Sequence, residues 1–215
     1  MATLTIPTRF NGPADSANGG VSCGLLAQAT GLDEITLRRP PPLGVPMRLE
    51  GTSLYDGDAL VATAAAGAVT VSPVAPVTLA EAAAATAGYR GTQDHPYPSC
   101  FVCGPEHPTG LHLFAGPVRD DVVAAPWTPV DDDPVMVWAA LDCPSAWASD
   151  LPGRPLLLGR MSLQQHAVPV PGEEHVVMGW LVGEEGRKVL TGSALYTSAG
   201  DLVALAQHTW IAVTP

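Results

Sequence analysis

The sequence predicts an α+β protein made of two fused units, each with one helix against an antiparallel β-sheet. Three observations support this fold class. A plan of strand, turn and strand between Pro41 and Val71 returns between Pro169 and Val213. Side chains alternate along these strands, as in Val176 to Leu181, with a turn about every ten residues, which indicates sheets with one covered face. One apolar helical segment precedes each set of strands.

The first helix is expected from about Val21 to Ala29. Asn18 is a favourable N-cap, and Gly31 is a natural residue to end the helix. The preceding turn, Asn18-Gly19-Gly20, exposes backbone N–H groups at the positive end of the helix dipole, where a carbonyl oxygen or an anion would bind. The alternative is that Asn18 only caps a buried helix and the glycines only form a turn.

The repeat is expected to keep a nearly constant spacing between its two copies. Three pairs of glycines define the spacing, and they are separated by 128, 128 and 129 residues: Gly44 and Gly172, Gly51 and Gly179, and Gly57 and Gly186. Pairing of the two units would also hide a sheet edge that each unit alone would expose.

Between the repeats, Thr78 and Glu81 form a capping-box pattern before a run of alanines, and Gly88 could end that helix. We therefore predict an N-terminal unit at 1–75, a linker helix with Pro-rich ends at 76–98, and a C-terminal unit at 99–215. The second unit's helix should begin with Asp133 as N-cap and Pro134 at its first position. Pro144 should then kink or end that helix, because proline lacks a backbone N–H.

The composition of the chain argues against several classes of partner and against insertion into a membrane. The formal net charge of -11 disfavours nucleic acid and anionic lipid as partners, although a local basic pocket for one phosphate is compatible with it. No run approaches the roughly 18 apolar residues of a membrane span. The first ten residues have no signal-peptide pattern, so a cytoplasmic protein with four reduced cysteines is expected.

The stretch Ser99 to Val118, the apolar helix with one carboxylate and the segment Pro169 to Val213 together resemble the hotdog-fold acyl-thioester superfamily. The resemblance covers nearly the whole chain and is strongest to fused, double-hotdog, thioesterase-like members. It implies two fused hotdog units, each a long helix wrapped by an antiparallel β-sheet, with a site at the interface between them. It also implies an acyl-CoA or acyl-carrier-protein substrate, no cofactor, and a homodimer of double hotdogs as a candidate assembly. It does not fix the reaction.

The superfamily's common thioesterase pattern is a His-Gly-Gly-like turn with an acidic residue about two turns further along the helix. Here Asn18 stands in place of the histidine, and Gln28 stands where the acid belongs. The second half has the acid, Asp142, which we align with Gln28, but Pro134 stands where Gly20 stands in the first half. The first half has the glycine turn without the acid, and the second half has the acid without the glycine turn. The resemblance therefore implies one composite site per chain.

In that site Asp142 would act as general base or nucleophile, Asn18 would orient the carbonyl or the water, and the N–H of Gly20 or Val21 would hold the oxyanion. Apolar neighbours would raise the pKa of Asp142. The alternative for Asp142 is a structural carboxylate bonded within its helix or to Ser145. The residues predicted to contact substrate are Gly19, Val21, Trp138, Ser145 and Gln28, with Trp138 and Trp147 lining either core or an acyl tunnel.

Three weaker signals remain. Cys100 and Cys103 have zinc-knuckle spacing, but no second Cys/His pair accompanies them, so we expect a tight turn and no metal. Cys23 and Cys143 are expected to be inert core thiols. His166 could face the cleft or simply pack. The prediction is an acyl-thioester hydrolase; the alternatives are a non-catalytic acyl- or CoA-binding protein and a hotdog dehydratase or hydratase.

Overall fold

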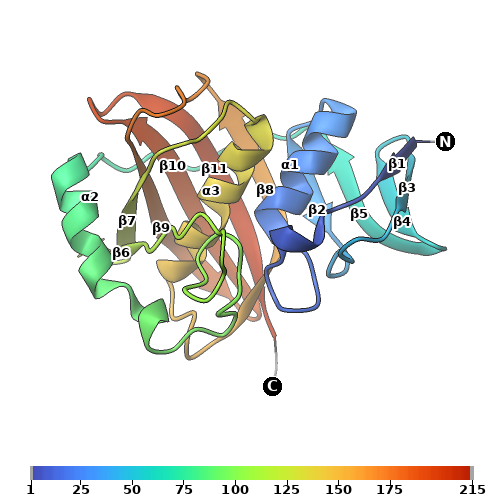
Figure 1. Cartoon of the computed structure of the whole chain (residues 1–215), viewed down its shortest axis with the longest axis horizontal. Coiled ribbons are helices and arrows are strands. Elements are labelled where there is room, and N and C mark those ends of the chain that lie inside the picture. The colour runs from blue at the N-terminus through green and yellow to red at the C-terminus, as the bar shows by residue number, and fades with distance from the viewer. Residues whose placement is uncertain (1, 214–215) are drawn as a thin grey trace.

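The computed structural model describes residues 2–213, and the segment boundaries predicted at residues 1 and 215 lie outside them. Eleven antiparallel strands form one continuous sheet in the order β1-β3-β4-β5-β2-β8-β11-β10-β9-β7-β6 (Figure 1). The strands are β1 (Ala2–Leu4), β2 (Glu34–Leu37), β3 (Met47–Glu50), β4 (Ser53–Asp56), β5 (Ala59–Ala65), β6 (Gly116–Arg119), β7 (Val122–Trp127), β8 (Leu156–Gln165), β9 (His175–Glu185), β10 (Lys188–Thr197) and β11 (Leu202–Ala212).

The two halves of the sheet repeat one topology. The first half runs β1-β3-β4-β5-β2, with helix α1 (Gly19–Thr30) between β1 and β2 in the chain. The second half runs β7-β9-β10-β11-β8, with helix α3 (Pro134–Trp147) between β7 and β8. The halves join where β2 pairs with β8, Ile35 opposite Met161. The predicted α+β class with two helix-and-sheet units is confirmed.

The predicted glycine spacing is correct for one pair and wrong for the others. Gly44 and Gly172 both have positive φ in the loops before β3 and β9. Gly179 lies inside β9, however, so Gly51 in the β3–β4 turn corresponds to Gly186 in the β9–β10 turn. By the same topology Gly57 corresponds to Gly200, and the separations grow from 128 to 135 to 143 residues. They grow because the second-half strands are longer.

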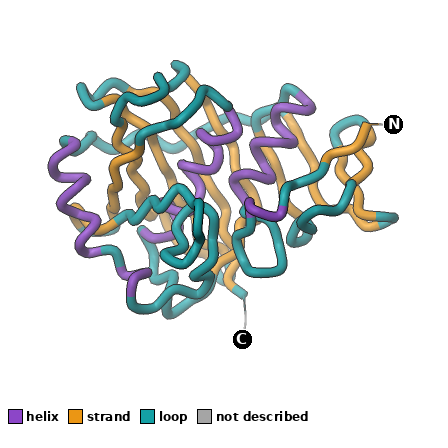
Figure 2. Tube along the Cα trace, in the orientation of Figure 1, coloured by secondary structure: helices purple, strands orange, loops and turns teal. Residues whose placement is uncertain are grey.

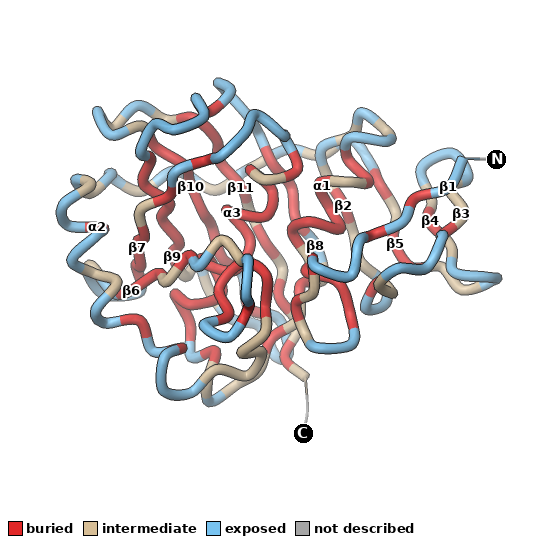
Figure 3. The backbone as a smooth tube through the Cα atoms, in the orientation of Figure 1, coloured by how far each residue is buried: buried red, intermediate tan, exposed pale blue. Residues whose placement is uncertain are grey.

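Both long helices lie side by side on the same face of the sheet (Figure 2), and α3 is buried along nearly its whole length (Figure 3). Asn18 caps α1 by accepting from the Val21 N–H at 2.9 Å, and Gly31 ends it in the left-handed conformation. Asp133 caps α3, with Pro134 at its first position, as predicted. Because Asn18 is the cap, α1 begins two residues earlier than expected.

Pro144 does not end α3, which continues to Trp147. Strand β9 makes room beside it, because a side chain at Gly179 would lie only 2.4 Å from the Pro144 carbonyl oxygen. Within residues 2–213, no helix combines the length and the apolar character needed to cross a bilayer.

The linker forms helix α2 (Leu79–Ala85), and its predicted capping box between Thr78 and Glu81 is present. Short 3₁₀ turns follow at Thr86–Gly88 and Arg90–Thr92, and another (Thr8–Phe10) precedes α1. Ala82 and the apolar residues before α2 pack against Met178 and Tyr196, which belong to a second apolar cluster. Neighbouring residues such as Val177 and Leu195 belong instead to the main core with α1 and α3. Because side chains alternate along a strand, the linker covers the sheet face opposite the two long helices.

Candidate functional site

Two glycines of α1 let its first turns press against the middle of α3. A side chain at Gly20 would place its Cβ 2.6 Å from both the Asp142 Cβ and the Trp138 carbonyl oxygen. A side chain at Gly24 would meet the Val135 Cα at 3.0 Å. This close approach brings the N-terminus of α1 to Asp142, which is only 1% exposed.

The carboxylate of Asp142 binds the start of α1 through one oxygen. Oδ2 accepts from the Gly20 N–H at 2.9 Å and from the Asn18 Nδ2 at 3.0 Å. Oδ1 is buried and has no hydrogen-bond partner among residues 2–213. Burial raises the pKa of Asp142 to about 7, and the hydrogen bond from Gly20 opposes that rise. One oxygen therefore fixes the position of the carboxylate, while the other has no hydrogen-bond partner among the described residues.

A cavity of about 270 Å³ reaches this carboxylate. Asn18, Gly19 and Asp142 form part of its wall, and leucines such as Leu156 and Leu158 supply apolar surface. Three exposed cations, Arg38, Arg39 and Arg187, also line it. The arrangement offers an apolar chamber with a buried acid inside and positive charge on its solvent side.

Solved structures of other proteins resemble this chain in fold, although no sequence family matches it. No family model and no curated protein matches the sequence. A protein of unknown function with a hot dog fold from Alicyclobacillus acidocaldarius superimposes with a TM-score of 0.64 at 12% identity, over 99% of this chain and 93% of that one. The chain has a double-hotdog fold. The tesB protein of Mycobacterium avium subs paratuberculosis agrees, with a TM-score of 0.60 at 13% identity, over 98% of this chain and 91% of that one.

Within the double hotdog, the structure brings Asp142, Asn18 and Gly19 together at the cavity. It contradicts the predicted role of Gly20 and Val21 as oxyanion donors, because the first N–H binds Asp142 and the second binds the Asn18 side chain. Neither residue lines the cavity. Gly19 does, and its N–H makes no hydrogen bond with any other described residue.

The remaining predicted contacts lie away from the cavity. Gln28 is exposed on α1, and counting from the two N-caps places Ala27, not Gln28, at the position of Asp142. Trp138 is buried between the helices. His166 is exposed and does not line the cavity. The count from the N-caps moves the aligned position of the acid by one residue, and the three placements remove Gln28, Trp138 and His166 as candidate ligand contacts.

Ser145 is a structural residue. Its hydroxyl donates to the Asp142 backbone carbonyl at 2.9 Å and accepts from the Trp210 Nε1 at 3.0 Å. The carboxylate of Asp142 is therefore not held by Ser145, contrary to the structural alternative. Trp147 is buried against Tyr89 and His95 and does not line the cavity either, so it belongs to the core.

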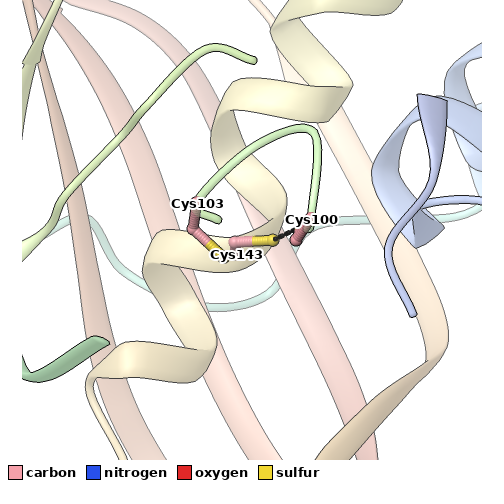
Figure 4. Close-up of side chains that lie close together, drawn as sticks. All are labelled: Cys100, Cys103 and Cys143. Carbon is pink, nitrogen blue, oxygen red and sulfur yellow. Dashed lines mark hydrogen bonds between the residues drawn. The ribbon is translucent and has the colours of Figure 1, made fainter. Parts of the chain in front are cut away.

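Sequence reasoning missed one wall of the cavity, formed by His95, Tyr97, Cys100 and Cys103 together with Cys143 of α3. Figure 4 shows the three cysteines with their sulfur atoms gathered. Hydrogen bonds from the Cys103 and Cys143 thiols lower the pKa of Cys100 well below its ordinary value. The available signal was the Cys-x-x-Cys spacing, and only the fold supplies the third thiol.

Proposed function

We propose that the protein is an acyl-thioester hydrolase with one composite site between its two hotdog halves. The observation that carries this proposal is the contact between Asp142 of α3 and Asn18 of α1 in the wall of an apolar cavity. A buried carboxylate with one uncommitted oxygen, beside a helix N-terminus, suits hydrolysis at a carbonyl.

Each group of the site has a distinct chemical role. Oδ1 of Asp142 would take a proton from the attacking water, or attack the carbonyl carbon itself. The Gly19 N–H would donate to the thioester oxygen as it becomes negative, aided by the positive end of the α1 dipole. Asn18 would hold the carboxylate through Oδ2, and Oδ1, which has no hydrogen-bond partner among the described residues, would be the oxygen that reacts.

The cavity also favours a particular class of substrate. The chain carries a formal charge of -11, yet Arg38, Arg39 and Arg187 gather at one cavity. Guanidinium groups bind phosphates well. We therefore propose a coenzyme A thioester, with its phosphates at these arginines and its acyl chain against the leucines. An acyl-carrier protein, which presents one phosphate, would use fewer of these contacts.

The site should occur once per chain. Position 27, which corresponds to Asp142 when the helices are counted from their N-caps, is an alanine. A second site would therefore lack its carboxylate. Titration with a non-hydrolysable acyl-CoA analogue should find about one productive site per chain, and two equivalent sites would contradict the composite arrangement.

The decisive experiment is thiol release from a panel of acyl-CoAs by the whole chain. Asp142→Asn preserves the shape of the side chain and should lower turnover about 10²- to 10⁴-fold, the usual contribution of a general base. Gln28→Ala is the matched control, because Gln28 is exposed on the other helix. Binding of acyl-CoA without turnover by the parent would instead support the acyl-binding alternative, and formation of an enoyl or hydroxyacyl product would support the hydratase alternative.

A further inference from the structure

Three thiols from two distant parts of the chain meet at one point. Cys100 and Cys103 come from the loop after the linker, and Cys143 comes from α3. Their three sulfur atoms all lie within 4.8 Å of one another, and the Cys100 and Cys143 sulfurs are 3.6 Å apart (Figure 4). All three cysteines are free and buried. Such a triangle is the donor set of a thiolate metal site, not of a single reactive cysteine.

The dimensions of the triangle fit zinc. A Zn–S bond of about 2.3 Å in tetrahedral geometry places two sulfurs about 3.8 Å apart. The observed 3.6 Å between Cys100 and Cys143 is close to that edge, and the 4.8 Å limit requires only small side-chain adjustments for the others.

The loop backbone is shaped to present two of the thiols. The Gly104 N–H donates to the Cys100 carbonyl at 2.8 Å, which closes a tight turn over Cys100 to Cys103. A side chain at Gly104 would lie 2.4 Å from the Cys100 nitrogen and from the Pro98 carbonyl oxygen, so this turn requires glycine. Such a turn with Cys-x-x-Cys spacing is typical of the segments that supply two of the ligands in zinc sites.

Neighbouring donors surround the sulfurs. The Asn18 Nδ2 lies 3.6 Å from the Cys143 sulfur and 3.8 Å from the Cys100 sulfur. The His95 Nε2 lies 3.4 Å from the Cys103 sulfur. Since the His95 Nδ1 accepts from the Tyr97 N–H, a neutral ring carries its proton on Nε2. His95 therefore donates from Nε2 to Cys103, whose carbonyl oxygen lies at 3.2 Å and whose sulfur lies at 3.4 Å. It is not a fourth ligand, and a donor beside a metal ligand is typical of the groups that surround such sites.

We propose that Cys100, Cys103 and Cys143 bind one zinc ion whose fourth ligand is a water molecule from the cavity. Zinc binds cysteine as the thiolate, so binding would release the thiol protons, and the metal charge would offset the negative charge of the buried sulfurs. Thiolate ligands select soft or borderline ions, and a tetrahedral site with three protein ligands is typical of zinc with an open position. The three cysteines line the same cavity as Asp142, so the open position faces that cavity.

The proposal is independent of thioester hydrolysis, since a metal ion can be detected whether or not the chain has turnover. The test measures zinc in the whole chain, expressed with zinc and purified without oxygen. About one equivalent of zinc per chain is expected. Cys143→Ser should lose most of it, whereas Cys23→Ser should keep it, because Cys23 is a buried thiol of α1 outside the cluster.

Reconstitution of the parent with cobalt keeps the test informative if Cys143→Ser fails to fold. Sulfur-to-cobalt charge-transfer bands are expected, and X-ray absorption of the zinc form should fit three sulfurs and one oxygen or nitrogen. Parent protein that holds no zinc after reconstitution would overturn the proposal. So would retention of zinc by folded Cys143→Ser, a fit with four sulfurs, or a disulfide among the three cysteines in anaerobic protein.

Discussion

Replacement of Gly20 by alanine tests how the two helices build the site. The new Cβ would lie 2.6 Å from the Asp142 Cβ and from the Trp138 carbonyl oxygen, and 3.0 Å from the Ala139 Cα. Two of these atoms are helix backbone, so rotation of a side chain cannot relieve the overlap. Helix α1 must move away from α3, and overpacking of this kind costs about 1–3 kcal/mol. The movement would also stretch the 2.9 Å bond from the Gly20 N–H to Asp142.

The assay is chemical denaturation of the parent and three variants. Gly20→Ala should lower the free energy of unfolding by about 1–3 kcal/mol. Gly24→Ala should cost less, because its tightest contacts are 3.0 Å. Gly183→Ala in β9 is the matched control, since nothing lies within 4 Å of its Cβ, and it should stay within about 0.5 kcal/mol of the parent. Gly20→Ala as stable as Gly183→Ala would refute the proposed close contact.

Three further predictions concern the substrate, acid stability and core. Combined Arg38→Ala and Arg39→Ala should raise KM for acyl-CoA with kcat nearly unchanged in steady-state kinetics, because these cations would bind only the phosphates; unchanged KM would remove them from the site. Burial lowers the pKa of His208 from its ordinary 6.5 to about 3. Between these two pH values the unfolded chain binds a proton that the folded chain does not, so the free energy of unfolding decreases as the pH is lowered from about 6.5 to 3. His208 contributes at most about 1.4 kcal/mol per pH unit to this slope, and His208→Leu should remove that contribution when denaturation is measured at several pH values. Trp210→Phe should destabilise the fold by about 1–3 kcal/mol in the same assay, since the indole N–H binds Ser145 and Thr191; parent-like stability would contradict this.

The sequence predicted the local features of the fold well because each depends on neighbouring residues. The caps at Asn18 and Asp133, the end of α1 at Gly31 and the capping box at Thr78 all rest on side chains that bond backbone within a few positions. The register of the repeat was predicted less well. It depends on strand length, and the longer second-half strands place Gly179 inside a strand where the first half has the turn at Gly51.

In the candidate site, too, some features could be predicted from the sequence and others depended on the packing of distant segments. The pairing of Asp142 with Asn18 was predicted from the resemblance to paired hotdogs, together with a comparison of the two halves of the sequence. The assignment of Gly20 failed because sequence alone cannot show that its N–H faces a carboxylate and that its Cα packs on Trp138. The third thiol of the cysteine cluster could not be predicted, because 40 residues separate Cys143 from Cys103 and only the packing of the loop on α3 joins them.

The thiol cluster gives a physical reason for asparagine at the helix entrance. One Asn18 side chain serves four partners. Oδ1 accepts from the Val21 N–H, while Nδ2 donates to the Asp142 carboxylate and lies near two sulfurs, 3.6 Å from Cys143 and 3.8 Å from Cys100. An amide has two N–H donors and one acceptor oxygen, whereas a neutral imidazole has one donor and one acceptor. A histidine could therefore cap α1 and bind Asp142 but would leave the sulfurs without that donor. If the cysteines hold zinc, asparagine at this position is the residue that joins the carboxylate, the helix and the metal ligands in one hydrogen-bond network.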